Sequence, residues 1–479
     1  MRFKGFIGPS YTLSTVNIDC QRSVNLFYES DEMKTGKDGE MGILLGTPGL
    51  LLLATIGTGP IRGLYTTTTG VLYAVSGNTL YSLSSIWGQT VIGTLQTNSG
   101  PVSMTDNGPT AGSLFICDGA NGYSVTLSTN AFAQITAADW VGSNLVTFQD
   151  GYFIFAQPNT AQFYLSDLNA TTFNAPATTG KNGGSDNIIS IICFQRNLWL
   201  FGDRTTEVWY DAGSNTNPFQ YISGSMSQIG CAAAYSPAII NNNLFWLGKD
   251  ATGAGVVYTA SGWAPQRIST HAVEIAIQKY STISDALGWT YEENGHQFYV
   301  LTFPTGNNTW VYDLATGFWH ERCYNNMGQF QRHRANCYAA AYGVHVVGDY
   351  SNGNIYQQSL TQYFDNTTPI IRQRISPHVS NDMNEVFYSR FQLDMETGVG
   401  VDGGTQGTNP QAMLSWSDDG GHSWSNEHWA SIGAIGSYKY RAIWRRLGKS
   451  RNRVFKLSIS DPVKTALIGA SIDVMPGVA

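Results

Sequence analysis

The chain has 479 residues, of which 13% are charged, and its formal net charge of −7 argues against phosphate neutralisation by its surface as a whole. Soluble domains usually carry roughly 25% charged residues, so this low charge indicates a surface that largely faces other protein. The length exceeds the roughly 250–300 residues at which one core stops growing, which excludes a small single-core fold and predicts two domains or a large repeat array.

Residues 1–60 are expected to form an extended lead-in, because they do not share the repeat that follows them. The first residues contain no apolar signal-peptide core, and the apolar run 50–56 is too short to span a bilayer. We therefore expect neither an export signal nor direct membrane insertion.

A short aromatic-aliphatic run, followed by a Gly, Asp or Asn turn, returns throughout residues 61–365. The runs are marked by Tyr73, Phe115, Phe153, Trp199, Phe245, Phe298 and Val346. These markers recur about every 40–50 residues, which is the length of a four-stranded propeller blade. The sequence therefore predicts an all-β chain whose β-propeller has six or seven blades. A helix-like insertion at residues 271–287 interrupts the pattern.

After residue 365 the period ends, and residues 366–479 predict a C-terminal β-sandwich domain. Alternating apolar positions indicate strands at 387–393, 454–460 and 466–472. The Gly/Thr/Asn-rich stretch 398–410 is expected to be a mobile loop, and the sequence assigns it no role.

An Asp-box pattern lies within this second domain and consists of Ser417, Asp419, Gly421, Ser423 and Trp424. Sialidase-like glycosidases usually carry several such boxes inside their blades, whereas this one lies outside the repeat. We therefore favour a structural hairpin, in which the Asp caps backbone N–H groups, Gly adopts a positive φ angle and Trp packs beneath the turn.

Histidine and cysteine side chains cluster at His320, Cys323, His333 and Cys337, and these are the donor types that bind zinc. If residues 318–324 form a strand, His320 and Cys323 point to opposite faces and cannot share an ion, so we expect no metal site. The chain's six cysteines are widely spaced, which predicts reduced thiols in a cytosolic setting.

Two acidic pairs, Glu292-Glu293 and Asp418-Asp419, could suggest general acid–base catalysis. Adjacent residues of an extended chain face apart, whereas such catalysis needs two carboxylates across a cleft. We expect turn and surface roles for these pairs, and we predict no catalytic residues and no cofactor.

A basic cluster near the C-terminus offers a possible contact for an acidic partner or for DNA, although runs of charge are usually solvated surface. Its members are Arg441, Arg445, Arg446, Lys449, Arg451, Arg453 and Lys456.

The segment that contains this cluster, residues 443–457, reads IWRRLGKSRNRVFKL. It resembles the C-terminal signature of the tail hub proteins of short-tailed phages, also called nozzle or packaged-DNA stabilisation proteins. Residues 22–29, which read RSVNLFYE, and 45–50, which read LGTPGL, are similar to the opening pattern of that family. The resemblance covers nearly the whole chain.

The resemblance implies a non-enzymatic virion protein of the phage tail, assembled in the cytoplasm of the bacterial host. Such proteins form a homo-hexameric ring below the portal and its adaptor ring, and the C-terminal β-sandwich would serve as the hub and oligomerisation domain. The ring extends the DNA ejection channel, helps a needle or plug to retain packaged DNA, and anchors tailspikes or tail fibres. Genomic DNA would pass through without sequence-specific binding.

Two other functions stay open at this point. A propeller glycosidase, sialidase-like or a depolymerase, would require Arg, Glu and Tyr side chains to meet at the central pocket of the propeller. A kelch-like binding module is suggested by residues 312–319, although the paired glycines of kelch repeats do not recur consistently.

Overall fold

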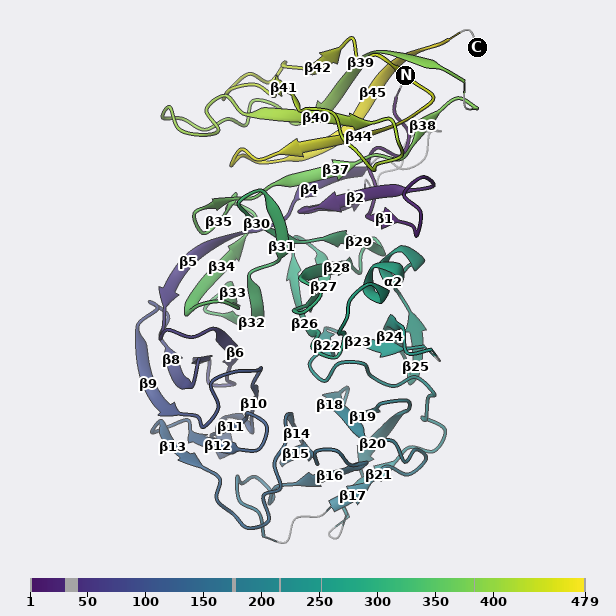
Figure 1. Cartoon of the computed structure of the whole chain (residues 1–479). Coiled ribbons are helices and arrows are strands. Elements are labelled where there is room, and N and C mark those ends of the chain that lie inside the picture. Colours follow the sequence, from purple (N-terminus) through teal and green to yellow (C-terminus); the bar gives the residue numbers. More distant parts are fainter. Residues whose placement is uncertain are drawn as a thin grey trace.

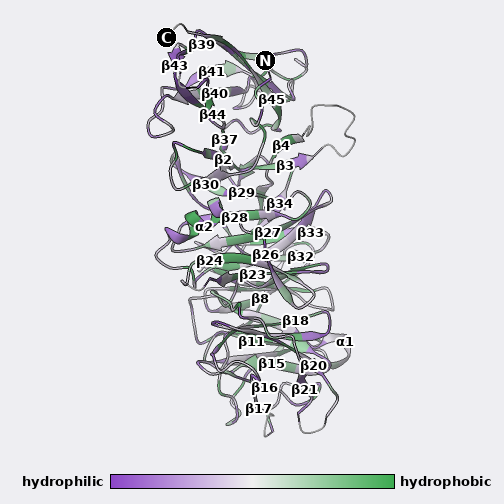
Figure 2. Ribbon diagram, turned by 90° about the vertical axis from the view of Figure 1, so that its right-hand side faces the viewer, coloured by the Kyte–Doolittle hydropathy of each residue, from purple (hydrophilic) through white to green (hydrophobic). Residues whose placement is uncertain are grey.

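The computed structural model describes residues 2–30, 42–174, 178–214, 217–250, 252–382 and 384–477. Two β domains are stacked along the long axis of the molecule, with the propeller below and the sandwich above (Figure 2). The described residues include two helices, α1 (Gly108–Ala111) and α2 (His271–Gln278). None of the described helices is both long enough and apolar enough to cross a membrane.

The propeller consists of seven four-stranded antiparallel blades (Figure 1). From the innermost strand outward, blade 1 consists of β6 (Ile61–Thr66), β7 (Leu72–Ser76), β8 (Thr79–Leu83) and β9 (Gln89–Thr94), blade 2 of β10 (Ser103–Asp106), β11 (Ser113–Cys117), β12 (Gly122–Thr126) and β13 (Ala131–Gln134), and blade 3 of β14 (Val146–Gln149), β15 (Tyr152–Ala156), β16 (Gln162–Leu165) and β17 (Thr178–Gly180). Blade 4 consists of β18 (Ile188–Phe194), β19 (Asn197–Gly202), β20 (Thr206–Asp211) and β21 (Phe219–Tyr221), and blade 5 of β22 (Ala238–Ile240), β23 (Asn243–Lys249), β24 (Gly255–Ser261) and β25 (Ala264–Arg267). Blade 6 consists of β26 (Leu287–Glu293), β27 (His296–Phe303), β28 (Asn308–Asp313) and β29 (Phe318–Glu321), and blade 7 of β32 (Ala335–Ala341), β33 (Val344–Asp349), β34 (Asn354–Ser359) and β5 (Gly49–Thr55).

Each of the seven repeat markers lies on the second strand of a blade, so the predicted propeller is confirmed and the number of blades is seven. The markers recur because this strand is buried on both faces between neighbouring blades. Phe115 of blade 2 lies 5.4 Å from Phe153 of blade 3, measured between ring centroids, and Phe245 of blade 5 stacks on Tyr299 of blade 6 at 5.1 Å. Large aromatic side chains at this position fill the space between blades.

The predicted helix-like insertion is confirmed as α2, although it is shorter than expected. The Thr270 side chain caps the helix by accepting a hydrogen bond from the Val273 N–H. Val273 and Ile277 are buried against blades 5 and 6, and strand β26 already begins at Leu287.

Strand β5 closes the propeller from the N-terminal side. It pairs antiparallel with β34 and is the outermost strand of blade 7. Its residue Leu50 is buried in a cluster with Val347 and Tyr356 of the same blade. The closure therefore joins residues about 300 positions apart in sequence and ties the ring of blades together.

The remaining strands form the sandwich and its junction with the propeller. They are β1 (Tyr11–Thr12), β2 (Cys20–Val24), β3 (Leu26–Ser30), β4 (Gly42–Gly46), β30 (Cys323–Asn326), β31 (Gln329–Arg332), β35 (Phe364–Asp365), β36 (Thr368–Pro369), β37 (Arg372–Ile375), β38 (Val379–Ser380), β39 (Val386–Met395), β40 (Gln411–Ser417), β41 (His428–Ser431), β42 (Ala442–Arg445), β43 (Lys449–Ser450), β44 (Asn452–Ile459) and β45 (Ala466–Pro476).

One continuous sheet connects the two domains. Strand β2 pairs parallel with β29 of blade 6 and antiparallel with β37, and the sheet continues through β44, β40 and β41 into the sandwich. The second sandwich sheet has the order β3-β4-β45-β39-β42. Phe391, Trp444 and Phe455 pack between the sheets, with ring centroids 5.0–5.8 Å apart.

The segment 1–60 is consequently no separate lead-in in its described part. It contributes β1 and β2 to the junction, β3 and β4 to the sandwich, and β5 to blade 7. The physical reason is burial, because Leu26, Phe27 and Leu44 are apolar side chains with 0–3% exposure that an isolated extended arm would leave in water. The loop 398–410 connects β39 with β40.

Candidate functional site

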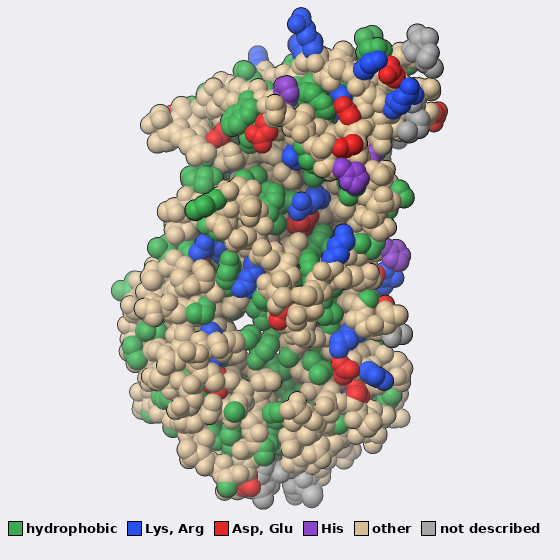
Figure 3. Space-filling view, viewed as in Figure 1, with side chains coloured by type: hydrophobic (Ala, Val, Ile, Leu, Met, Phe, Trp, Pro, Cys, Tyr) green, Lys and Arg blue, Asp and Glu red, His purple; other side chains and the backbone are tan. Residues whose placement is uncertain are grey.

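The innermost strands of six blades, together with residues just before β22 of blade 5, surround an axial cavity of about 280 Å³. Figure 3 shows its opening near the centre of the propeller. Its lining is of mixed polarity, and the larger polar or aromatic side chains in it are Arg62, Tyr235, Trp289 and Tyr338. The described lining contains no carboxylate, which is the group that the glycosidase alternative requires.

Arg62 is the charged residue of that lining, and its guanidinium is fully used inside the protein. It donates hydrogen bonds to the carbonyl oxygens of Gly77, Thr97, Ser99 and Gly100 at 2.6–2.9 Å, and to the Thr97 hydroxyl. The residue is 3% exposed. Its role is to fix the connection between blades 1 and 2 rather than to face a ligand.

The Asp-box residues form a capped turn between β40 and β41. The Asp419 carboxylate accepts hydrogen bonds from the backbone N–H groups of His422 and Ser423 at 2.9–3.0 Å and from the Ser423 hydroxyl. The Ser417 hydroxyl donates to the same carboxylate at 2.6 Å and accepts from the Gly421 N–H. These bonds, led by that of Ser417, lower the pKa of Asp419.

Gly421 of the box and the preceding Gly420 have positive φ angles, +101° and +78°, as the tight turn requires. Trp424 packs on a small buried cluster that contains Cys20, Ile375 and Val454. The box therefore fastens the hairpin to the junction between the domains.

The histidines and cysteines that resemble zinc ligands are dispersed. His320 lies on β29 and Cys323 on β30, two strands of different sheets, while His333 precedes β32 and Cys337 lies on it. The Arg322 guanidinium lies 3.0 Å from His333 Nε2. In the part of the chain that the structure describes, no group of three or more His, Cys, Asp or Glu side chains could hold a metal ion. All six cysteines are free thiols.

The acidic pairs occupy unrelated positions. Glu292 is exposed on β26 and accepts a hydrogen bond from Asn241 at 3.0 Å. Asp418 forms a bidentate ion pair with Arg453, at 2.6 and 2.7 Å. Neither pair faces the axial cavity.

The structure divides the basic cluster into internal and external members. Arg453 is 2% exposed and, besides Asp418, lies over the rings of Tyr388 and Trp416 at 4.5 and 5.2 Å. Lys449 pairs with Glu385 at 2.9 Å, and Lys456 Nζ lies 4.5 Å from the Trp424 ring.

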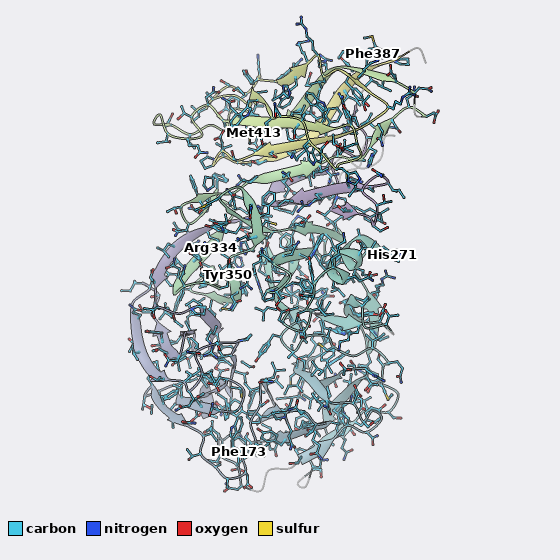
Figure 4. The ribbon with its side chains drawn as sticks, viewed as in Figure 1. Phe173, His271, Arg334, Tyr350, Phe387 and Met413 are labelled. Atoms are coloured by element: carbon cyan, nitrogen blue, oxygen red, sulfur yellow. The ribbon has the colours of Figure 1, made fainter. Side chains whose placement is uncertain are left out.

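The external members are Lys449, whose side chain is 54% exposed, and the arginines Arg441, Arg445, Arg446 and Arg451, all of which are exposed on or near β42 and β43. Arg445 lies opposite Arg390 on the neighbouring strand β39. Figure 3 shows Lys and Arg side chains at the end of the sandwich far from the propeller, where Figure 4 places Phe387. The exposed part of the basic cluster therefore lies on this end of the sandwich.

Two arginines at the domain junction, the fully buried Arg374 and the partly exposed Arg22, form contacts that the sequence does not indicate. Arg374, on β37, is 0% exposed and donates to the carbonyl oxygens of Gly5, Phe6 and Pro9 at 2.6–3.1 Å and to the Gln21 side chain. Burial lowers its pKa to about 9. Arg22 of β2 forms a bidentate pair with Glu321 of β29 at 2.6 and 2.9 Å.

These contacts join the N-terminal residues, the propeller and the sandwich at one place. The alternation Arg372-Gln373-Arg374 was the available signal, since it puts two arginines on one face of a strand. Their burial depends on N-terminal segments that cover this face, which the local sequence does not reveal.

Comparison with known proteins identifies both domains. A family model described as "Bacteriophage P22 Gp10, beta-propeller" matches residues 20–363, and one described as "Bacteriophage P22 Gp10, beta-sandwich" matches residues 371–475. None of the curated proteins compared with the chain matches it.

Several solved structures are similar to the chain at low sequence identity. A streptogramin B lyase shares 10% identity at a TM-score of 0.43, and the alignment covers 70% of this chain and 98% of the lyase. Virginiamycin B lyase from Staphylococcus aureus shares 10% at 0.45, covering 65% and 98%. The WD40 domain of Neurospora crassa Pan2 shares 9% at 0.42, covering 63% and 89%.

Proposed function

The chain belongs to the bacteriophage P22 Gp10 family, the tail hub or nozzle proteins of short-tailed phages, and from this premise we propose that six copies form a ring below the portal and its adaptor. The chain is thus a structural protein of the phage tail and a component of the virion. The observation that carries the proposal is that the propeller and sandwich models match in order over nearly the whole chain. A structural tail family also points to a non-enzymatic role.

The proposed ring extends the channel through which DNA leaves the capsid. The axial cavity of each propeller, about 280 Å³, is far too small for this path, because the major groove of duplex DNA alone is about 12 Å wide. The channel would instead run between the subunits. A net charge of −7 on each subunit suits a wall past which DNA slides without sequence-specific binding.

The continuous sheet supports a role under mechanical load. Packaged DNA exerts pressure on the tail, and a flexible linker between domains would let the channel wall yield. Here β2 pairs with β29 at Val24 and Glu321 and with β37 over three residue pairs, and these backbone connections support a subunit whose two domains move together.

The proposed partners are the other subunits of the homo-hexamer, the adaptor ring, the needle or plug that helps to retain DNA, and the tailspikes or fibres that the ring anchors. Assembly is proposed to occur in the cytoplasm of the bacterial host, a reducing compartment that suits the six free thiols. The exposed arginines near β42 are a candidate contact for an acidic partner or for DNA.

The test is cryo-electron microscopy of the purified protein, alone and mixed with the portal–adaptor complex of its phage. We expect six copies around an axial channel, with the ring formed on the adaptor even if the free protein is monomeric, because a template adds weak contacts together. A protein that stays monomeric and does not bind the portal–adaptor complex would contradict the proposal.

A further inference from the structure

A long stretch of the chain, from β4 of the sandwich through β5 and blades 1 and 2 of the propeller, has no exposed charge. Residues 42–138 contain three charged side chains, Arg62, Asp106 and Asp118, and all three are 3–9% exposed. In an ordinary soluble domain roughly a quarter of such a stretch would be charged. We call the surface that this stretch forms, with β5 and blades 1 and 2, the neutral flank.

The three charges of the neutral flank are used for internal contacts. Arg62 is surrounded by carbonyl oxygens, as described above. Asp106 accepts hydrogen bonds from the Thr68 N–H and hydroxyl at 2.7 and 2.6 Å, and Asp118 accepts from the Thr97 and Tyr123 hydroxyls. Charges are therefore present where the fold needs them and are missing from the surface.

The neutral flank is also apolar and has an open sheet edge. Ile86 is 86% exposed, Val91 63%, and Leu51 and Leu52 are each 42%. Val91 lies on β9, whose sequence QTVIGT has no charge and no proline and whose outer edge has no paired strand in the described structure. Soluble proteins usually protect such edges with charges or proline, because the free N–H and C=O groups bind other chains.

Blades 1 and 2 present this surface as one continuous face. The Phe132 ring of β13 lies against Gly93 of β9, so close that a Cβ atom on Gly93 would come within 2.3 Å of it. Strands β5, β9 and β13 follow one side of the molecule in Figure 1, and the left-hand margin of Figure 3 is correspondingly tan and green. The loops between β39 and β40 project to the same side.

We propose that a second copy of this chain docks on the neutral flank, which makes the flank the subunit contact of the ring. This inference rests on the proposed function. Each copy carries a net charge of −7, so two copies repel one another least when they meet through a face without charge. A strongly charged partner, such as DNA, would gain no attraction from such a face.

The long axis supports the same occupant. Strands β5, β9 and β13 of the neutral flank run down one side of the propeller, below the sandwich, and do not cross either end of the molecule (Figure 1). Neighbours in a closed ring meet through lateral faces, and the contact is heterologous, so the flank of one copy meets a different face of the next. Exposed aromatic side chains on blades 4 and 5, Tyr210 and Trp263, are 41% and 44% exposed and suit such a face.

In the first experiment, phage particles assembled without this protein are supplied with a mixture of wild type and Val91→Glu, and the amount of each that the particles incorporate is measured. A charge buried in the contact without a partner is strongly unfavourable, so we expect the variant to be incorporated less by a factor of about ten or more. Leu168→Glu is the matched control, because Leu168 is 57% exposed on blade 3 outside the flank, and it should compete equally with wild type. Circular dichroism and thermal melting verify that both variants fold.

The second experiment places a photo-crosslinking amino acid at position 86 in the assembled particle. A covalent dimer of this chain is expected after illumination, whereas a crosslink to another tail protein, or none, would overturn the inference. Equal incorporation of wild type and Val91→Glu would overturn it too while leaving the ring intact. Failure of wild type itself to enter particles would instead contradict the proposed function.

Discussion

The ion pair between Asp418 and Arg453 shows why charge patterns are read differently once the structure is known. Both residues belong to groups that suggested surface chemistry in the sequence, yet the Arg453 guanidinium is buried and Asp418 is its carboxylate partner at 2.6 Å. Arg453 also donates to the Leu447 carbonyl oxygen. The pair thus holds the 446–452 turn against the Asp-box hairpin.

Asp418→Asn should destabilise the protein, because it removes the countercharge of a buried guanidinium. The Asp418 side chain is 44% exposed, so solvent screening reduces the effect, and we expect a loss of about 1–2 kcal/mol in the free energy of unfolding. Urea unfolding monitored by fluorescence measures this loss. Asp402→Asn in the exposed loop after β39 is the control, and an equal effect of both substitutions would contradict the explanation.

The buried His320 should make the stability of blade 6 sensitive to acid. Burial, with the nearby Arg322 charge, lowers its pKa to about 3, whereas an unfolded histidine has a pKa of about 6.5. The depressed pKa favours the neutral ring, so this contribution to stability is present above about pH 6.5 and is lost as the pH falls. Between pH 6.5 and 5 the loss amounts to about 2 kcal/mol.

His320→Phe should remove this part of the pH dependence. The histidine ring lies near the rings of Phe27 and Phe298, at 6.4 and 6.0 Å between centroids, and a phenyl ring suits these neighbours. Unfolding free energies of wild type and variant, compared at pH 7 and pH 5, test the prediction. A variant that loses as much stability between pH 7 and pH 5 as wild type does would refute the prediction. The pKa of His296 is raised by its hydrogen bond to Asp313, so His296 adds stability as the pH falls, and it does so in both proteins.

Among the elements, β5 has the clearest individual role, because it closes the propeller. Gly49, at its start, lies so close to the connection after β34 that a Cβ atom would come within 2.5–2.6 Å of the Gln362 and Phe364 carbonyl oxygens. Gly49→Ala should therefore displace β5 and lower stability by about 1–3 kcal/mol. Hydrogen exchange should increase first in β34 and β5.

Gly180→Ala on β17 is the control for this closure, because the nearest atoms to an added Cβ there are 3.9 Å away. We expect it to leave exchange in blade 7 unchanged. If both substitutions speed exchange in blade 7 equally, closure by β5 does not limit the stability of that blade.

Elements with local signals could be predicted from the sequence, and elements that depend on distant partners could not. The repeat markers, six aromatic residues and Val346, identified the second strand of every blade, because burial between blades requires apolar residues there. The Asp-box turn could also be predicted from the sequence, because its hydrogen bonds join residues only a few positions apart. The sequence places β5 in an extended lead-in, because its partner β34 lies about 300 residues away and no local pattern indicates that the two strands pair.

The basic cluster near the C-terminus also shows which features local sequence predicts and which depend on distant partners. The basic cluster was visible as a run of charge, but its separation into a buried Arg453 and exposed arginines depends on Asp418, Tyr388 and Trp416, which converge only in the folded sandwich. Composition, in contrast, indicated a surface that faces other protein. The neutral flank is the local form of that signal.

At the scale of the whole molecule, the two domains should unfold as one unit. The sheet runs from blade 6 through β2 into the sandwich, and Arg374 binds the N-terminal segment to β37 from a fully buried position. Calorimetry of wild type should show a single transition whose calorimetric and van't Hoff enthalpies agree.

Arg374→Met leaves several buried carbonyl oxygens without donors, so it should lower the free energy of unfolding by about 3 kcal/mol or more. Hydrogen exchange in β28 and in β44 should then accelerate together, since the junction supports both domains. Arg390→Met, which removes a partly exposed pair with Asp473 in the sandwich, should cost less than about 1 kcal/mol. Two separate transitions in wild type, or faster exchange in one domain alone in the Arg374 variant, would mean that the domains are mechanically independent and that the stiff-subunit argument for the channel wall fails.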